Sequence, residues 1–570
     1  MIEIRRRPLA PASDFAADLH PVLRRVYAAR GIASTQDLDV SLERLLPVST
    51  LDGVQRAARV LAEQRAAGRV LVIGDFDADG ATGSALLVRA LRGLRFAHVD
   101  FLVPDRFRFG YGLSPGIVAQ AAERRPTLIV TVDNGVSSIE GVAAARAQGI
   151  PVLISDHHLP GARLPDAAAI VNPNLASSCF GSRALAGVGV AFYLAAALTR
   201  LLGDSEFKPS ALLDLVALGT VADLVPLDRN NRVLVAQGLK RIRAGRCVAG
   251  IRALVQLAGR RLDQLTAADL GYAVAPRLNA AGRLTDMSIG IACLLTDDAE
   301  RALALASELT KLNEERREIE QRMQLEAVEL AAAVRFDDSG SEQLGLCLFD
   351  PDWHQGVVGL VAGRIKDRLH RPVIAFARAA AGTLRGSARS VSGINIRDVL
   401  EAISTRHPGL IDKFGGHAMA AGMTLSEASL ETFRGAFAAE IAACADPDSL
   451  RGVIVSDGEL PPEELSIETA RVLRAAGPWG AGFPEPIFDG DFTVADARIV
   501  GGRHLKLQLR AGTAPARAAL DAIAFGYVGG ALEEPRLEPG ARIDLAYRLE
   551  VNEYHGAEQV QLNCQHLKLR

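Results

Sequence analysis

The sequence predicts an α/β protein that begins with a parallel-sheet domain and ends with an antiparallel β-barrel. Three observations support this fold class. Short apolar runs alternate with helical stretches between residues 69 and 171, a run without Gly or Pro extends from Asp297 to Arg335, and alternating apolar and polar residues follow residue 486. Near-continuous Val, Ile and Leu runs between helices are typical of a parallel sheet that helices cover on both faces.

The parallel-sheet domain is expected over residues 49–235, after a small helical or irregular lead-in over residues 1–48. Its strand candidates are residues 69–74, 99–103, 127–132, 151–155 and 168–171. Helices from about Thr82 to Arg92, over 114–124 and over 137–148 separate these strands. The uncharged stretch from Ala184 to Thr199 is shorter than the ~20 residues that span a bilayer, and it therefore predicts a buried helix.

A helical region over residues 236–335 is expected to end in the Gly- and Pro-free stretch. At 1.5 Å per residue, a helix of that extent would be about 58 Å long. This length exceeds the diameter of a small domain, so the stretch predicts a long connecting helix between two lobes.

A second α/β domain is expected over residues 336–447, with strands near 344–349, 372–376 and 383–387. Residues 448–570 then predict a barrel of the OB type, a fold that can hold single-stranded nucleic acid. Its strand candidates are 492–494, 504–510, 522–525 and 542–547. Pro478–Pro486 predicts a stiff loop, in which Trp479 and Phe483 are interpreted as core or domain-interface residues.

Composition limits the class of protein. The 570 residues are 49% hydrophobic and 23% charged, which is ordinary for a soluble globular protein and excludes a disordered or fibrous chain. The net charge of −3 argues against an entirely basic surface, but it leaves a local nucleic-acid site open. Six scattered Cys without a Cys-x-x-Cys pair make a disulfide framework or a thiolate zinc site unexpected. With no apolar stretch after the basic N-terminus, we expect no secretory signal and a cytoplasmic protein.

Acidic residues follow three of the predicted strands. Asp75, Asp77 and Asp79 follow the first, Asp133 follows the third, and Asp156-His157-His158 follows the fourth. Ligands of open α/β sheets bind at the carboxyl ends of the strands, so these side chains should meet at one edge. Like charges so close together raise one another's pKa. Divalent cations would resolve the conflict, and oxygen ligands with imidazole suit Mn²⁺ or Mg²⁺.

Each motif alone also has a structural reading. Asp-Gly after a strand is often only a turn, and adjacent histidines are often a surface pair. A calcium loop of the EF-hand type would need flanking helices, whereas a strand precedes this loop. Three motifs at equivalent strand ends of one sheet favour the metal site over these readings.

The motifs, taken in order, resemble those of the DHH phosphoesterase family, and within it the bacterial single-strand-specific DNA exonucleases. The family is named for the motif that stands here as Asp156-His157-His158. Its first motif matches residues 75–80, with Phe76 in place of the usual Tyr, and its second matches 133–135. Later motifs match residues 219–227, 276–283, 353–359, 386–390 and 415–417, the last two in the associated DHHA1 domain. The resemblance covers roughly residues 50–570.

The resemblance implies two bound cations, Mn²⁺ or Mg²⁺. Asp77 and a bridging Asp133 would hold one, while Asp79, Asp133, His157 and Asp223 would hold the other. Asp75 would ligate or orient. His158 and Asp156 are the predicted catalytic residues, and His158 would contact the scissile phosphate or steady the leaving oxygen. Support of a neighbouring ligand is the alternative for His158.

The second lobe is expected to hold the nucleic acid. Ser387 and Arg389 lie on one side of an extended strand and could clamp the 5′ end, although Ala388 stands where the family usually has Gly. Gly415 and Gly416 could present backbone N–H groups to a phosphate, and His417 could add a donor. The remaining predicted substrate-binding residues are Arg277, Asn279, Arg283 and His354, for which salt-bridge or capping roles are the alternative.

Arg106, Arg108 and Tyr111 combine cations with rings near a predicted strand end. Arginines there could hold phosphates while bases stack on the rings. Phe107 and Phe109 beside them could equally belong to the core.

The resemblance implies a metal-dependent 5′→3′ exonuclease that degrades single-stranded DNA in repair and recombination. The implied partners are single-stranded DNA, a RecQ-type helicase and single-strand-binding protein; we expect no membrane association and a monomer. Two alternatives differ in chemistry. A phosphodiesterase for short oligonucleotides or cyclic dinucleotides would not need the last 120 or so residues, and a replication scaffold would have lost metal acids that this chain retains.

Overall fold

The computed structural model describes residues 2–8, 14–333, 343–380, 382–512, 519–527, 537–554 and 556–570. These residues form two compact units. The first unit holds the described residues up to 314 together with residues 474–485. The second unit holds residues 2–8, 315–473 and 486–570 as far as they are described.

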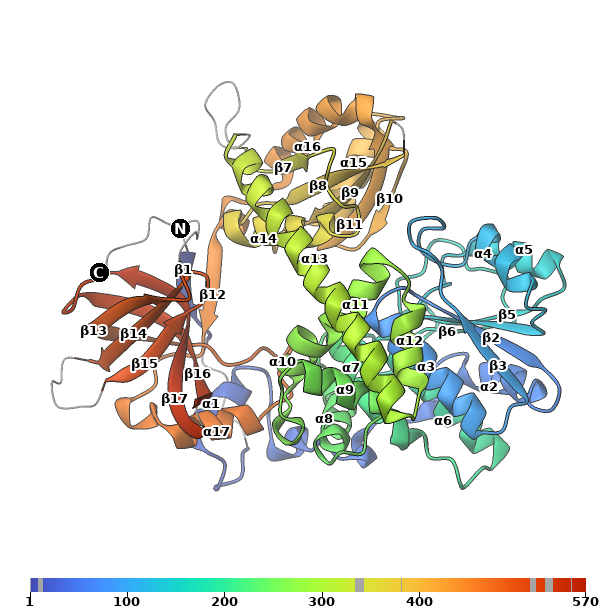
Figure 1. Ribbon diagram of the computed structural model, residues 1–570, viewed down its shortest axis with the longest axis horizontal. Helices are drawn as coiled ribbons and strands as arrows, with labels where there is room; N and C mark the ends of the chain where they lie inside the picture. The colour runs from blue at the N-terminus through green and yellow to red at the C-terminus, as the bar shows by residue number, and fades with distance from the viewer. Residues whose placement is uncertain are drawn as a thin grey trace. The chain divides into compact units, whose positions relative to one another are not determined.

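A five-stranded parallel sheet organises the first unit, as predicted, in the order β3-β2-β4-β5-β6 (Figure 1). The strands are β2 (Arg69–Gly74), β3 (His98–Leu102), β4 (Leu128–Val132), β5 (Val152–Ser155) and β6 (Ala169–Val171). Helices α4 (Pro115–Ala122) and α5 (Ile139–Ala147) pack on one face. Helices α2 (Val54–Glu63), α3 (Ala78–Gly93) and α6 (Gly187–Leu202) pack on the other. Covered on both faces, the sheet directs its ligands to its carboxyl edge.

Helix α3 begins four residues earlier than the predicted Thr82. The Asp77 side chain caps it by accepting a hydrogen bond from Gly80 N at 3.0 Å, a common role for Asp at a helix N-terminus. Because the helix begins at Ala78, Asp79 lies in its first turn instead of in a loop.

The rest of the first unit is mostly helical, as predicted. Its helices are α1 (Pro21–Ala28), α7 (Leu213–Ala222), α8 (Arg229–Arg243), α9 (Ala249–Leu257), α10 (Ala267–Asp269), a π-helix (Leu270–Val274), α11 (Ala275–Leu284) and α12 (Ser288–Leu295). Helix α13 (Ala299–Ala333) continues from the first unit into the second and is about 52 Å long at 1.5 Å per residue. Its predicted last two residues lie outside the described ones. No helix among the described residues is both long and apolar enough to cross a membrane.

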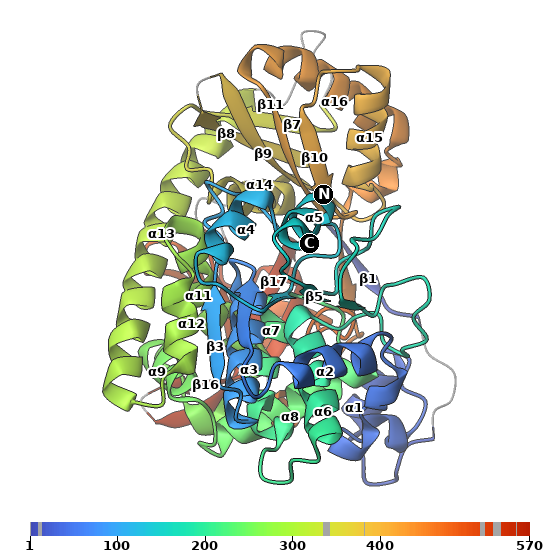
Figure 2. The same ribbon diagram turned by 90° about the vertical axis from the view of Figure 1, so that its right-hand side faces the viewer.

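The second unit contains a mixed sheet in the order β10-β11-β9-β8-β7 (Figure 2). Its strands are β7 (Leu346–Phe349), β8 (Val373–Ala380), β9 (Thr383–Arg389), β10 (Lys413–Gly416) and β11 (Ala420–Ser426). Helices α15 (Ile396–Arg406) and α16 (Leu430–Cys444) share a core with one face. Helices α13 and α14 (Val358–Leu369) share a core with the other.

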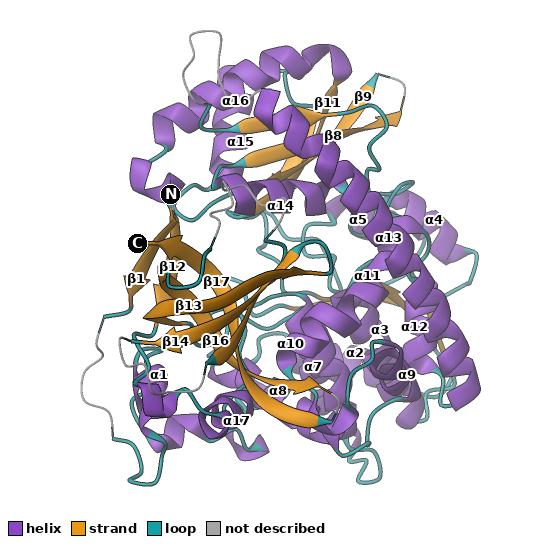
Figure 3. Ribbon diagram, turned by 60° about the vertical axis from the view of Figure 1, so that its left-hand side comes forward, coloured by secondary structure: helices purple, strands orange, loops and turns teal. Residues whose placement is uncertain are grey.

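The predicted C-terminal barrel is closed, in the order β13-β14-β15-β17-β16 (Figure 3). Its strands are β13 (Phe488–Val500), β14 (His504–Ala511), β15 (Leu520–Ala524), β16 (Arg542–Tyr554) and β17 (Ala557–Leu569), and α17 (Ile467–Ala475) precedes them. Two features differ from the prediction. Strand β17 was not expected, because half of its side chains are polar, and it pairs with β15 in parallel.

The lead-in is largely helical or irregular, as expected, and contains α1, but its first residues form a strand. Strand β1 (Ile2–Arg6) pairs in parallel with β12 (Gly452–Ser456). Its partner lies about 450 residues away in sequence, so no local pattern could reveal this pairing.

Candidate metal centre

Six predicted ligands converge at the carboxyl edge of the parallel sheet. Their side chains form two compact groups, Asp75–Asp77–Asp133 and Asp79–His157–Asp223. The groups meet at His157, whose Nε2 lies 3.1 Å from Asp133 Oδ1 and 3.5 Å from Asp223 Oδ2. Two neighbouring sets of oxygen and imidazole ligands therefore share one edge.

Backbone geometry holds Asp133 and Asp79 in place. Asp133 adopts a φ of 63°, a left-handed conformation that is uncommon for a non-glycine residue and is concentrated at functional sites. Asp79 accepts hydrogen bonds from Gly187 N at 2.6 Å and Val188 N at 2.9 Å. These N–H groups begin helix α6, whose N-terminus favours a negative charge. The first turn of α3 and the first turn of α6 are thus joined through one carboxylate.

Burial places the acids in electrostatic conflict. Asp75, Asp79 and Asp133 are at most 6% exposed. Burial, together with repulsion between neighbouring carboxylates, raises the pKa of Asp75, Asp133 and Asp223 well above the usual value and that of Asp79 to about 7. Desolvation and like charges act in the same direction here.

The donor set fits a pair of divalent cations. Among the described residues, Asp133 Oδ1 and Asp223 Oδ2 are buried oxygens that accept no hydrogen bond. A buried acceptor without a hydrogen bond is costly, and a cation would satisfy both oxygens and relieve the repulsion. Carboxylates with one imidazole suit Mn²⁺ and Mg²⁺. The residues thus fit the predicted cofactor, while the role of each residue stays a prediction.

Asp156 uses its carboxylate to fix the histidine motif. Oδ1 accepts hydrogen bonds from His157 N and His158 N and lies 2.8 Å from His158 Nδ1, and Oδ2 accepts from Val136 N. Burial alone would raise the pKa of Asp156, but the His158 contact outweighs it and lowers the pKa. Burial alone would lower the pKa of His158, and Asp156 raises it instead. The Asp156 carboxylate therefore fixes the position of the His158 ring and shifts its pKa towards the protonated form.

An aromatic and cationic group lies beside His158. Tyr111 Oη lies 3.0 Å from His158 Nδ1 and donates a hydrogen bond to the Asp133 carbonyl at 3.2 Å. The Phe76 ring packs edge-on against Tyr111, and the Arg106 guanidinium lies 4.5 Å from the Phe76 ring centroid. Arg106 and Tyr111 therefore lie beside the metal centre, while their predicted substrate contacts stay a prediction. Arg108 instead lies over its neighbour Phe109, 4.9 Å from the ring centroid.

Helix α11 brings a predicted substrate-binding segment to the first turn of α3. Asn279 Oδ1 accepts a hydrogen bond from Ala78 N at 2.8 Å, which corresponds to the capping alternative. Arg277 donates to Thr310 Oγ1, to Leu257 O and, at short range, to Ala273 O. The Arg277 guanidinium therefore connects α9, the π-helix and α13. Arg283 lies in the last turn of the same helix.

The predicted substrate residues of the second unit lie on one sheet. Ser387 and Arg389 are on β9, and Gly415 and Gly416 are on β10. Gly415 is opposite Gly422 of β11, which is opposite Ser387, so these three positions cross the sheet in one line. A Cβ at Gly359, in the first turn of α14, would lie 2.8 Å from Arg389 Nη2 and 3.3 Å from Ser387 Oγ. The turn that begins α14 thus borders Ser387 and Arg389.

The two predicted histidines of the second unit occupy turns next to these positions. His354 Nδ1 accepts a hydrogen bond from Gly356 N at 3.1 Å, just before α14. His417 follows β10, and its backbone N donates to Ala420 O. Gly416 has a φ of 148°, a backbone conformation that favours glycine.

The sequence analysis did not identify two glycines and two asparagines of the metal centre as functional residues. A Cβ at Gly187 would lie 2.6 Å from Asp133 Cβ, and one at Gly219 would lie 3.0 Å from Asp79 Oδ1. Asn172 donates to the His158 carbonyl and Asn174 to the His157 carbonyl. The asparagines follow β6, so the strand-end rule that found the acids would have found them. The glycines carry no such signal.

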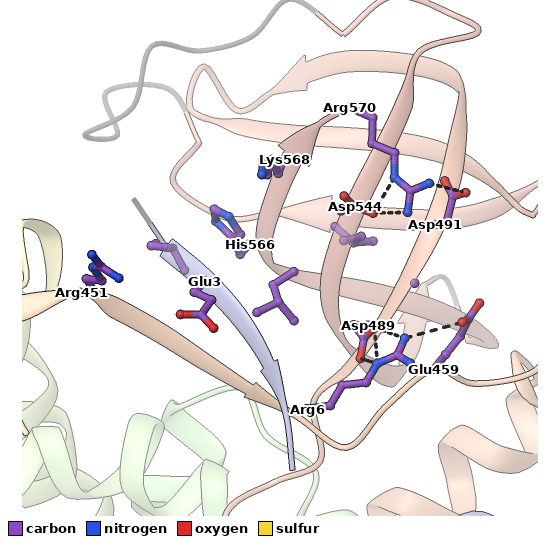
Figure 4. Close-up of a pocket in the computed structure, with 14 residues that line it drawn as sticks. Glu3, Arg6, Arg451, Glu459, Asp489, Asp491, Asp544, His566, Lys568 and Arg570 are labelled. Carbon is purple, nitrogen blue, oxygen red and sulfur yellow. Dashed lines mark hydrogen bonds and ion pairs between the residues drawn. The ribbon is translucent and has the colours of Figure 1, made fainter. Parts of the chain in front are cut away.

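A pocket in the second unit is separate from these residues (Figure 4). It lies between β1 and the barrel, and several of the charged side chains that line it form ion pairs. Arg6 pairs with Asp489 at 2.5 Å, and Arg570 pairs with Asp544 at 2.6 Å. None of the predicted site residues lines it.

Comparison with known proteins matches this architecture. Residues 69–220 match the DHH family N-terminal domain, residues 342–443 the DHHA1 domain, and residues 456–566 the RecJ OB domain. The chain is 51% identical to the single-stranded-DNA-specific exonuclease RecJ of Escherichia coli, over 98% of both chains. The chain belongs to the RecJ family. RecJ of Bacillus subtilis is 33% identical over 90% of this chain and 62% of its own length.

Solved RecJ structures share the fold. The crystal structure of Thermus thermophilus RecJ in complex with Mn²⁺ has a TM-score of 0.81 and 30% identity, covering 99% of this chain and 79% of that one. The Mg²⁺ complex of the same protein has a TM-score of 0.75 and 29% identity, covering 99% and 78%. Both metals predicted from the ligand set are thus bound by a RecJ relative.

Proposed function

We propose that this protein is a metal-dependent exonuclease that hydrolyses single-stranded DNA from the 5′ end during DNA repair and recombination. The observation that carries the proposal is the convergence of Asp75, Asp77, Asp79, Asp133, His157 and Asp223 at one sheet edge. The RecJ relatives, named as single-stranded-DNA-specific exonucleases over nearly the full length, supply the substrate class.

The ligands divide between two cations, Mn²⁺ or Mg²⁺. Asp75, Asp77 and Asp133 would hold one, and Asp79, His157 and Asp223 would hold the other, with Asp133 reaching both groups. When bound, such a pair activates a water nucleophile and neutralises charge on the phosphate.

His158 is the group that handles a proton. Asp156 and the surrounding acids raise the pKa of His158 above its usual value despite burial. This shift favours the protonated ring, which can donate to the leaving oxygen as a general acid. The hydrogen bond at Nδ1 directs the ring. Asp156 therefore orients the acid, and Tyr111, 3.3 Å from His158 Nε2, borders the same space.

The second unit binds the strand. Arg389 provides a cation and Ser387 a hydroxyl on the same face of β9, while Gly415 and Gly422 leave the adjacent sheet surface without side chains. A phosphate can approach backbone groups closely over such glycines. We assign 5′-end binding to this face, and His354, Gly416 and His417 to its border.

Several finer statements are part of the same proposal. We propose a cytoplasmic location, supported by six free thiols, and action as a monomer beside single-strand-binding protein and a RecQ-type helicase. We also keep the five-part division at residues 48, 235, 335 and 447 as a proposal. The proposed substrate contacts of the first unit are Arg106, Arg108, Arg277, Asn279 and Arg283. Of these, Asn279 also accepts a hydrogen bond from Ala78 N at the start of α3.

The test is a metal-titrated nuclease assay on single strands labelled at either end. We expect turnover only with Mn²⁺ or Mg²⁺ and early release of the 5′ label as a mononucleotide. A long strand should outcompete a dinucleotide, and blunt duplex should be degraded far more slowly. Equal rates on duplex and single strand at low salt would refute strand specificity, and early release of the 3′ label would refute the polarity.

A further inference from the structure

Residues 474–485, here called the clamp segment, belong to the first unit although the residues on either side of them belong to the second. The segment begins in the last two residues of α17, ends before β13 and contains the Trp479 and Phe483 loop. The proposed function leaves this segment unused. What it contacts in the first unit gives it a role.

Stacked rings and cations fasten the clamp segment to the first unit. The Trp479 and Phe483 rings stack with centroids 5.1 Å apart, and Tyr27 of α1 lies 5.8 Å and 6.2 Å from them. Arg30 lies 5.4 Å from the Trp479 centroid, and Arg232 of α8 lies 4.4 Å from that of Phe483. Each cation–ring contact adds to the attachment.

Between the two anchored rings, the segment contacts the turn after α7. Leu227 N donates a hydrogen bond to Ala481 O at 2.7 Å. A Cβ at Gly482 would lie 3.1 Å from Pro226 Cβ, and one at Gly480 would lie 2.8 Å from Leu227 Cδ1. The two glycines therefore permit a backbone approach that larger residues would prevent.

The contacted turn begins at the predicted ligand Asp223. Asp223 is the C-cap residue of α7, and Leu224 follows with a φ of 61° and a side chain that is 71% exposed. A left-handed residue after a helix is usually glycine, and a leucine there persists only when its surroundings enforce the conformation. Asn231 holds the same turn from α8 by donating to Pro226 O at 2.9 Å.

We propose that the clamp segment is a positioning element for cation binding: by holding residues 225–227 it enforces the left-handed turn at Leu224 and so aims Asp223 at His157 and Asp79. This inference rests on the proposed function, because it assumes that Asp223 is a cation ligand. Trp479 and Phe483 act through Asp223 and touch neither cation nor substrate.

The test measures Mn²⁺ binding to the full chain by the loss of the free-ion electron paramagnetic resonance signal. Trp479→Ala should weaken binding at the site of Asp223 about tenfold, the effect typical of losing a residue that supports a ligand. Trp479→Phe should keep the Mn²⁺ affinity of the unaltered protein, because an aromatic ring is kept.

Phe437→Leu, in the Phe433–Phe437 stack of the second unit, is the control, because it removes a ring that does not contact the turn after α7. Phe483→Leu is the second clamp variant if Trp479→Ala does not fold.

A double variant separates positioning from general stability. Asn adopts left-handed backbone more readily than Leu, so Leu224→Asn should recover much of the Mn²⁺ affinity lost in Trp479→Ala. Mn²⁺ binding of Trp479→Ala equal to that of the unaltered protein, or an equal loss in Phe437→Leu, would overturn the inference. Failure of the unaltered protein to bind Mn²⁺ would instead overturn the proposed function itself.

Discussion

Glycine has opposite consequences at the two candidate sites. In the first unit, glycines let the backbone pack against the acids, so that a Cβ at Gly187 would lie 2.6 Å from Asp133 Cβ. In the second unit, a Cβ at Gly415 or Gly422 would meet nothing within 4 Å. The first site is closely packed around its acids, and the second has an open surface at Gly415 and Gly422. This difference agrees with the proposed roles, which are chemistry at the first site and strand binding at the second.

The largest expected effect is that of removing Asp133, the carboxylate that lies near both groups of metal ligands. Asp133→Ala should lower kcat about a hundredfold to a thousandfold, the size of loss that follows removal of one preorganised electrostatic group. Affinity for single-stranded DNA should stay nearly unchanged, because the proposed phosphate contacts are arginines and do not include Asp133. Single-turnover assays and fluorescence anisotropy measure the two effects. Equal loss of affinity would contradict the separation of roles.

A methyl group at Gly187 tests the closed packing. Gly187→Ala should displace Asp133 and lower both Mn²⁺ affinity and kcat about tenfold to a hundredfold, as for loss of a group that orients metal ligands. Gly189→Ala is the matched control, because its Cβ would approach only the Leu185 side chain, at 3.1 Å. Similar losses from both variants would show that helix α6 as a whole is sensitive.

A variant of Arg389 tests the proposed strand-binding surface of the second unit. Arg389→Ala should raise the Kd for single-stranded DNA about tenfold and reduce the slope of log Kd against log salt by about one phosphate contact, while kcat at saturation stays constant. Arg378→Ala, which removes an ion pair with Glu427 from the same sheet, should change neither the Kd nor the slope. A fall in kcat with unchanged Kd would place Arg389 in the chemistry instead.

Neighbouring glycines of β10 separate binding from folding. Gly415→Ala has room for its methyl group, so it should weaken DNA binding severalfold without lowering the melting temperature. Gly416→Ala would place a Cβ 2.4 Å from Ala420 O at a φ of 148°, so it should lower the melting temperature. Thermal unfolding and anisotropy on both variants check this, and the open surface would be refuted if Gly415→Ala melted early while binding DNA normally.

The sequence could predict the metal acids because they obey a rule that is local in sequence. Each acid follows an apolar strand, and parallel strands end at one edge. Asp223 follows a helix instead, so only the family resemblance pointed to it. The parallel sheet, the connecting helix and most barrel strands were predictable from periodicity for the same reason.

What escaped prediction depends on contacts between distant residues. The pairing of β1 with β12 joins segments about 450 residues apart. The approach of Gly187 to Asp133 and of Ala481 to Leu227 also arises only after folding. Arg277 and Asn279 were predicted to contact substrate. Their hydrogen bonds within the first unit could not be predicted, because these contacts also join distant residues.

The smallest expected effect is a pH dependence that distinguishes the buried acids from the exposed sheet. Burial and repulsion raise the pKa of Asp79 from 3.8 to about 7. Between these values the folded, metal-free protein keeps a proton that the unfolded chain has lost, so its stability should fall as pH rises through this window. Mn²⁺ requires the deprotonated carboxylates, so its stabilising effect should grow with pH over the same range. Melting temperatures in EDTA and in Mn²⁺ should therefore diverge with rising pH, and Asp79→Asn should weaken the fall in EDTA. Parallel curves would mean that the acids do not bind the cation.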